Sequence, residues 1–293
     1  MKKLFTPPCK KLVFIYQLLF LFVPYYLYGQ IPSPIEMIFD PRENTFALSG
    51  IGGGNLGENF VLNNSSIGGQ IAIDMNFNLE NKKYYQSKLK TFTGILRYNP
   101  FVQSKYDSGA TMNMRKLAFT DNESQFILGV RYSTVKESQG NSSSKTLKTI
   151  FADLSSTQHT IIKIIDTMNS GFRNFNVNTG VQFGFLSDNG IGLASFTFNA
   201  YASYIYIYEN NIHGNSFEEL TQSSQKLSKN ILGGGARISV TFNSLCFFLD
   251  AKRYTPIGNS TNIRGLTERA LFSFGATATG VAFSKTRTGK NLK

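Results

Sequence analysis

The sequence predicts an all-β fold: a closed, antiparallel, up-and-down transmembrane β-barrel of about 12 strands. Three observations lead to this prediction. Apolar and polar residues alternate along extended stretches after residue 44, and a period of two turns successive side chains of a strand to opposite faces. Most of these stretches exceed the roughly 9–11 residues that a tilted strand needs to cross a bilayer. The chain also begins with a segment typical of exported proteins.

The N-terminal segment has the three parts of a secretory signal. Residues 1–11 contain four lysines and no acidic residue, residues 12–27 are almost entirely apolar, and Gly29 precedes Gln30. The apolar part is shorter than the roughly 20 residues of a spanning helix. We therefore predict a cleaved signal peptide at 1–30, with an uncleaved N-terminal anchor as the alternative.

The remaining chain divides into three predicted parts. Residues 31–44 are interpreted as a periplasmic leader or plug segment, 45–283 as the transmembrane β-barrel, and 284–293 as a basic disordered tail. The alternation is clearest along 67–79, 173–185 and 192–208. The twelve predicted strands are 45–54, 67–79, 88–98, 111–120, 125–136, 146–155, 159–168, 173–186, 190–208, 230–242, 245–254 and 269–283. Helical spacing of the apolar residues in 159–168 leaves a short helix as an alternative there.

The predicted connections alternate in length, as they do in outer-membrane barrels. Short, turn-like connections follow every second strand, including Ser156-Thr157, 187–189 and 243–244. The others are longer and rich in Asn, Ser and Gly, such as 136–145 and 209–229. The short stretch 169–171 is the one exception. An even strand number would place both ends of the barrel on the periplasmic side.

Composition favours a membrane barrel over a secreted β-sandwich, which also shows alternation. The chain has 26 Phe and 14 Tyr but no Trp. Tyr204, Tyr206 and Tyr208 fall on one face at the end of a long predicted strand, where an aromatic girdle belongs. The opposite faces carry Asn, Gln, Thr, Ser and Gly, which suits a wet or tightly packed lumen.

Charge indicates anionic rather than nucleic-acid partners. Without the four N-terminal lysines, 26 basic and 18 acidic residues remain, a formal net charge of +8. No Lys/Arg run marks a nucleic-acid arm. Outer-membrane lipid, lipopolysaccharide or a small anionic solute is the expected counter-charge, and an envelope protein is a further expected partner.

Candidates for catalysis are few, so we predict no enzyme and no cofactor. The only histidines are His159 and His213, and Ser216 follows the second without a nucleophile elbow. Two histidines without a cysteine cluster also argue against a metal site. Residues 52–57 match a dinucleotide-binding glycine pattern, but no helix is predicted after them, so a loop or bulge is favoured.

The most informative charges are those within predicted strands. A charged side chain on the lipid face at the membrane midplane costs about 2–4 kcal/mol for Arg or Lys, so such residues should point inward. The predicted lumen-lining residues are Asp74, Arg97, Arg131, Arg237, Asp250 and Lys252. Arginines lining an open lumen would favour anions. The alternative is that Arg and Asp pair across a filled interior.

In pattern and export signal, nearly the whole mature chain resembles outer-membrane β-barrel proteins as a broad class. The resemblance implies a bacterial outer-membrane location. Because it rests on no diagnostic motif, it leaves a range of functions open. The first hypothesis is a small, mildly anion-preferring pore. The second is a non-conducting structural or docking barrel that serves envelope secretion or surface attachment. The third is a lipid-modifying membrane enzyme.

Overall fold

A computed structural model describes thirteen parts of the chain, and every structural statement below refers to them. They are 44–56, 68–79, 88–98, 104–107, 126–137, 144–162, 170–188, 193–209, 217, 226–242, 245–258, 261–263 and 265–287. In these parts no helix has the length and apolar character needed to cross a membrane.

The described residues form eleven strands in one sheet. In chain order they are β1 (Asn44–Leu56), β2 (Gly68–Asn78), β3 (Lys88–Tyr98), β4 (Ser104–Asp107), β5 (Phe126–Glu137), β6 (Ser144–Ile162), β7 (Ser170–Asp188), β8 (Leu193–Glu209), β9 (Asn230–Phe242), β10 (Leu245–Pro256) and β11 (Leu271–Arg287). The short β4 pairs parallel with the end of β6. The other ten pair antiparallel.

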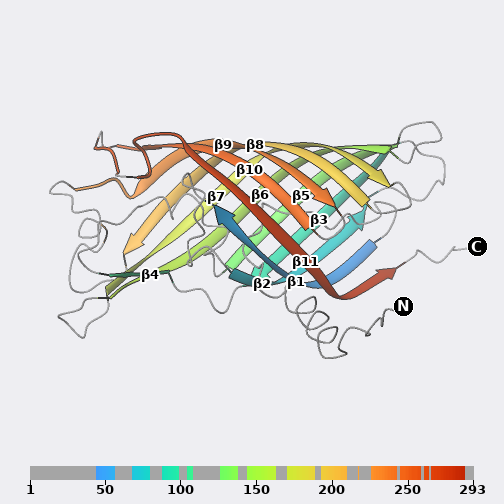
Figure 1. The fold of residues 1–293 in the computed structure, drawn as a ribbon, viewed down its shortest axis with the longest axis horizontal. Coiled ribbons are helices and arrows are strands. Elements are labelled where there is room, and N and C mark those ends of the chain that lie inside the picture. The colour runs from blue at the N-terminus through green and yellow to red at the C-terminus, as the bar shows by residue number, and fades with distance from the viewer. Residues whose placement is uncertain are drawn as a thin grey trace, which may run out of the picture.

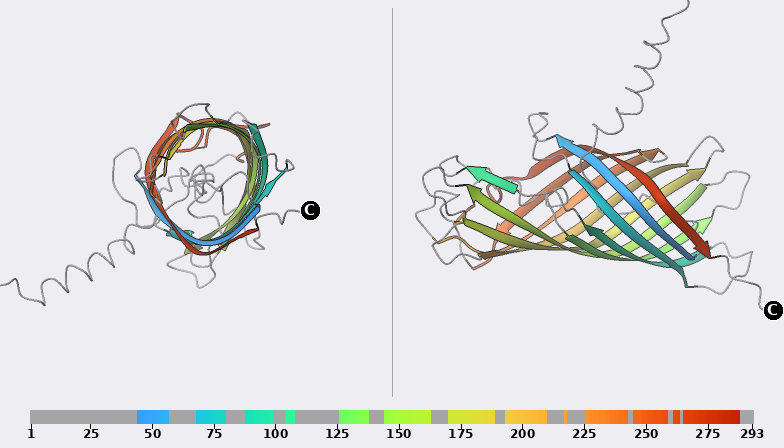
Figure 2. Two further views of the ribbon diagram at one scale, coloured as in Figure 1. Left: turned by 90° about the vertical axis from the view of Figure 1, so that its right-hand side faces the viewer. Right: turned by 90° about the horizontal axis from the view of Figure 1, so that it is seen from below.

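These ten strands are paired in succession around a ring. From β1 the pairings lead through β2, β3, β5, β6, β7, β8, β9 and β10 to β11. β11 then pairs along its length with β1. Seen end-on, the strands surround a common axis, and from the side they are tilted relative to it (Figures 1 and 2). We call this set the strand ring.

The two faces of the strand ring have opposite polarity. Where the burial of their side chains is described, most stretches of the ten strands alternate between buried and more exposed residues, as the two-residue period requires. The buried face, inside the ring, carries mostly Thr, Ser, Asn and charged residues, while the exposed face carries large apolar side chains. Ile71, Phe185 and Phe272 each expose at least half of their surface. This polarity is the reverse of that in a water-soluble protein.

The connections fall into two groups at opposite ends of the strand ring. Residues 79–87, 138–143, 189–192 and 243–244 lie between strands at one end, which we call the short-connection end. Residues 57–67, 99–125, 163–169, 210–229 and 257–270 lie between strands at the other, the long-connection end. Asn44 pairs with Arg287, so the first and last strands meet at the short-connection end.

Two sequence predictions about strands need correction. The predicted strand 146–155 and residues 159–162 of the predicted strand 159–168 belong to one strand, β6, whose pairing with β7 is continuous through Ser156-Thr157. Residues 163–168 lie outside the described residues. The predicted turn at Ser156-Thr157 is wrong because both residues continue the strand, with Thr157 buried on its polar inner face. β3 and β5 pair directly, and the predicted strand 111–120 lies outside the described residues. The described residues contain ten strands that pair antiparallel, compared with the twelve that the sequence predicts.

These corrections also change the predicted connections. The connection after β5, expected among the long ones, lies at the short-connection end. The stretch 169–171 is mostly the start of β7, which removes the exception to the alternation. β11 continues to Arg287, past the predicted end at 283. The predicted signal peptide 1–30 and residues 31–43 of the predicted leader lie outside the described residues.

Candidate functional site

The six charged residues predicted to line a lumen are all buried on the inside of the strand ring. The exposed fractions of Asp74, Arg97, Arg131, Arg237, Asp250 and Lys252 lie between 0% and 5%. They belong to β2, β3, β5, β9 and β10. The structure brings three of them together, and a fourth pairs with an aspartate that was not singled out from the sequence.

Asp250 is the centre of a buried network. One carboxylate oxygen, Oδ2, lies 2.6 Å from Nη2 of Arg237 and 3.3 Å from Nζ of Lys252. The other, Oδ1, accepts a hydrogen bond of 2.7 Å from the hydroxyl of Tyr201. The guanidinium of Arg237 also stacks 4.8 Å from the ring centre of Phe248. One carboxylate thus forms ion pairs with two cations and accepts a hydrogen bond from a phenol.

Glycines make room for this network. Tyr201 on β8 pairs with Gly235 on β9, which in turn pairs with Lys252 on β10. The Tyr201 ring passes over Gly235 of β9 to reach Asp250 on β10. A Cβ atom on Gly235 would lie 2.7 Å from the Tyr201 hydroxyl oxygen and would block this path. A Cβ on Gly233 would collide with the ring of Tyr254 in the same way. Gly233 and Gly235 therefore provide space inside the ring for the two tyrosine rings.

A second ion pair joins β5 and β6. Nη2 of Arg131 lies 2.6 Å from Oδ1 of Asp153, and both side chains are buried. The guanidinium also donates to the carbonyl of Val130 at 2.8 Å and stacks 4.9 Å from the ring centre of Phe151. Asp153 is not among the lumen-lining residues predicted from the sequence. Asp153 occupies one of the alternate positions of β6 that face inward, and this alternation was the signal that could have identified it.

The remaining two predicted residues lie on neighbouring strands. Arg97 on β3 pairs with Ala72 on β2, and Asp74 is the next residue on the same face of β2. Residues in such diagonal positions are within reach of long side chains. Nε of Arg97 has no hydrogen-bond partner among the described residues.

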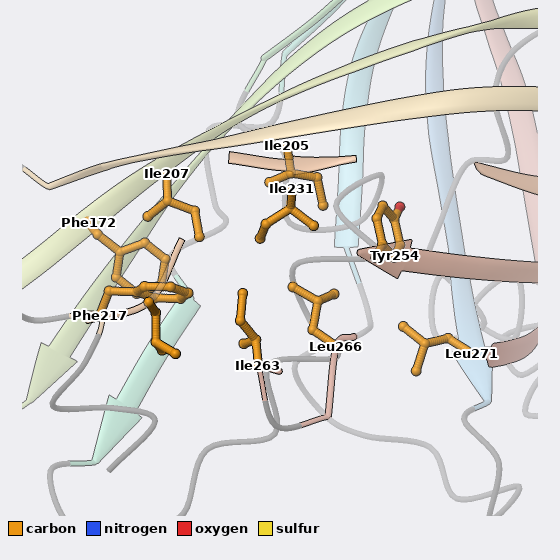
Figure 3. Close-up of a cluster of buried hydrophobic side chains, with 10 residues drawn as sticks. Phe172, Ile205, Ile207, Phe217, Ile231, Tyr254, Ile263, Leu266 and Leu271 are labelled. Carbon is orange, nitrogen blue, oxygen red and sulfur yellow. The ribbon is translucent and has the colours of Figure 1, made fainter. Parts of the chain in front are cut away.

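An apolar cluster occupies the long-connection end of the interior. There the inner face changes from polar to apolar, with Phe172, Ile205, Ile207, Ile231, Tyr254 and Leu271 pointing inward from β7 to β11. Phe217 and Leu227, between β8 and β9, and Ile263 and Leu266, between β10 and β11, belong to the same cluster. Figure 3 shows Phe217, Ile263 and Leu266 facing the strand residues. The rings of Phe172 and Phe217 meet edge to face at 5.8 Å. We call these ten residues the apolar plug.

Hydrogen bonds to backbone carbonyls hold the connections that carry the plug residues in place. Ile263 accepts hydrogen bonds from the amides of Leu266 and Thr267, both at 3.0 Å, and Gly265 has a positive φ of 75°. This turn brings Ile263 and Leu266 to the same side of the chain. Near Leu227, the hydroxyl of Ser228 donates to the carbonyl of Ile257 at 2.6 Å. The two connections are thereby tied together.

The predicted girdle residues lie on the outer face at the long-connection end of β8. Tyr206 and Tyr208 are 38% and 48% exposed, and Tyr204 is half-buried. The Tyr204 hydroxyl donates a 2.5 Å hydrogen bond to the side chain of Asn230. An aromatic ring with a satisfied polar end is typical of a lipid–water boundary.

Of the residues considered for catalysis, only His159 belongs to the described part of the chain, where it lies in β6, while His213 and Ser216 lie outside the described residues. The glycine-rich stretch considered for a nucleotide continues β1 as far as Leu56, so it is strand rather than the expected loop or bulge. The described parts of the chain contain no group of three or more His, Cys, Asp or Glu able to hold a metal.

Comparison with known proteins adds little. No family model and no curated protein matches the chain. A solved structure described as "Unveiling the Mechanism Behind the in-meso Crystallization of Membrane Proteins" is similar over 81% of this chain and 84% of that one, with 10% sequence identity and a TM-score of 0.26. This similarity is too weak to support an argument about fold or function.

Proposed function

We propose that the chain is a closed β-barrel of a bacterial outer membrane whose interior does not conduct ions, and that it acts as a structural or docking barrel of the cell envelope. The observation that carries the membrane placement is the polarity of the strand ring. Phe, Leu, Ile and Val side chains are exposed outside, and buried Arg, Asp, Asn and Thr side chains fill the inside. Water would oppose this arrangement, whereas a bilayer stabilises it.

Strand pairing supports the same proposal. In hydrocarbon every backbone N–H and C=O must be satisfied within the protein, so a spanning sheet cannot leave open edges. The pairing of β11 with β1 gives both of these strands two neighbours. The short-connection end, where the first and last strands meet, corresponds to the periplasmic side of known barrels.

Two features favour the non-conducting barrel over the anion-preferring pore. Arg131 and Arg237 each face a carboxylate at 2.6 Å, so their charges are neutralised locally rather than available to a passing anion. The apolar plug covers the inner wall at the long-connection end with side chains that do not bind water. A ten-stranded barrel is also closer in size to eight-stranded barrels, which fill with side chains, than to porins.

A docking role is favoured by the unequal ends of the barrel. Residues 99–125, 210–229 and 257–270 supply most of the chain between strands at the long-connection end. On an outer-membrane barrel this end faces the outside, where an envelope protein or lipopolysaccharide is reached.

Single-channel recording on planar bilayers tests the proposal. The chain purified from membranes in detergent should be folded, shown by faster gel migration before boiling than after, and should give no steady conductance once it is inserted into the bilayer. A stable, anion-selective conductance would restore the pore hypothesis. Recovery of the processed chain in soluble form without detergent would overturn the membrane placement.

Variants of the apolar plug make the test sharper. Phe217→Ser with Leu227→Ser should introduce conductance that the unchanged chain lacks, because polar side chains allow water into the mouth of the barrel. Leu232→Ser is the matched control, since Leu232 is 52% exposed on the outer face of β9. If the double variant stays silent while folded, the plug is not what closes the interior.

A further inference from the structure

Outward-facing lysines gather on one sector of the barrel, near the short-connection end. Lys90 lies on β3, Lys136 on β5 and Lys148 on β6. Lys136 and Lys148 are exposed, and Lys90 is half-buried. Lys90 and Lys148 both pair with Thr134 of β5, so the two are two strand spacings, about 10 Å, apart. Lys136 follows Thr134 on the same face, closer to the end of the strand.

The neighbouring positions toward the middle of the barrel are apolar. Phe92, Tyr132 and Ile150 pair with one another in the row next to Thr134, and they are 38%, 42% and 61% exposed. Within two residues along each strand, the outer face therefore changes from ammonium groups to large apolar side chains. A change this abrupt marks the boundary between headgroups and hydrocarbon.

The lysines are not part of a uniform basic rim. At the same end, the outer face carries Phe185 on β7, Phe242 on β9 and Leu245 on β10, with exposures of 64%, 55% and 49%. Among the described outward side chains of β3, β5 and β6 there is no carboxylate. On β7, β9 and β10 the same end thus presents large apolar side chains, whereas on β3, β5 and β6 it presents lysines.

We propose that Lys90, Lys136 and Lys148 form a binding site for the phosphate groups of anionic phospholipids in the leaflet at the short-connection end. Each ammonium offers three donors and a compact charge that suits a phosphate oxygen. The Thr134 hydroxyl lies between two of the lysines, and the apolar row provides a surface for the acyl chains. This inference rests on the proposed membrane placement.

Native mass spectrometry of the detergent-purified chain tests the site, with phosphatidylglycerol and the zwitterionic phosphatidylcholine as competing probes. The unchanged chain should retain phosphatidylglycerol preferentially. The variant with Lys90→Gln, Lys136→Gln and Lys148→Gln should lose at least about tenfold of that preference, since each lysine near an anionic surface contributes about fivefold. Gel migration before and after boiling verifies that each variant is folded.

A charge-matched control changes basic residues at the opposite end: Arg173→Gln, Lys226→Gln and Arg253→Gln, all three of which are exposed. It should keep the phosphatidylglycerol preference within about twofold. Equal preference in both triple variants and the unchanged chain would overturn the inference while leaving the membrane placement intact. Purified lipopolysaccharide serves as a second probe, and a lysine-dependent preference for it instead would place these residues in the other leaflet. Failure of the unchanged chain to enter bilayers would overturn the proposed function itself.

Discussion

Replacement of Asp250 by Asn tests whether the interior of the barrel is dry. Asp250 is completely buried, and its carboxylate faces Arg237 at 2.6 Å and Lys252 at 3.3 Å. Asn keeps the size of the side chain and an oxygen that can accept the Tyr201 hydrogen bond, but it carries no charge. The change therefore leaves two buried cations close together without the carboxylate that separates them.

The expected cost follows from the geometry. At 3.3 Å, one ion pair has a Coulomb energy of about 5 kcal/mol at an effective dielectric constant of about 20, but only about 1 kcal/mol in bulk water. Removal of one partner from a buried pair costs about 3–5 kcal/mol of folding free energy, whereas exposed pairs contribute about 0–1 kcal/mol. We expect Asp250→Asn to lower the free energy of unfolding by about 3–5 kcal/mol.

Urea unfolding of the chain refolded into phospholipid vesicles, followed by tyrosine fluorescence and gel migration, measures this free energy. Addition of Lys252→Met to Asp250→Asn should recover part of the loss, because one uncompensated cation is removed. A loss below about 1 kcal/mol, with no recovery in the double variant, would mean that water screens the network. The argument for a filled, non-conducting interior would then fail.

Three further changes can be measured by the same unfolding assay. Tyr201→Phe removes the hydrogen bond to a carboxylate and should cost about 1.5–3 kcal/mol; an unchanged stability would show that water replaces the hydroxyl. Gly235→Ala places a Cβ 2.6 Å from a carbonyl of β10 and should cost about 1–3 kcal/mol, whereas Gly50→Ala, with open space around it, should stay within about 0.5 kcal/mol. Val181→Arg, on the outer face near the middle of β7, should lower the free energy of unfolding in vesicles by about 2–4 kcal/mol. Tyr208→Arg, near the end of β8, should lower it by only about 0–1 kcal/mol. Equal losses would contradict a bilayer around the strand ring.

Alternation alone was enough to predict most strands and the face to which their charges point. The predicted range 230–242 coincides with β9, and 88–98 coincides with β3. The period of two fixes which residues share a face, and the cost of charge in lipid assigns the face with Arg131 and Asp250 to the inside. Both assignments follow from local chemistry, so no partner strand had to be known.

The continuity of β6 could not be predicted in the same way. Ser156 and Thr157 look like a turn because small polar residues favour turns in soluble proteins. In the strand ring the inner face is itself polar, and Thr157 is buried there, 0% exposed. A polar run within an inside-out sheet therefore has two interpretations that local composition does not distinguish. The pairing of β6 with both β5 and β7 decides between them.

The same limitation separates the two leading functional hypotheses. An arginine facing the interior attracts anions if it stands alone and fills space if it has a carboxylate partner. Arg131 finds its partner because β5 and β6 pair with Gly129 opposite Asp153, and the missing side chain of that glycine leaves room for the carboxylate. The sequence shows that Arg131 and Asp153 face inward, but it does not show which residues of neighbouring strands lie opposite each other. The pore and the filled interior differ in whether each arginine has a carboxylate opposite it. The pairing of the strands is therefore needed to choose between the two hypotheses.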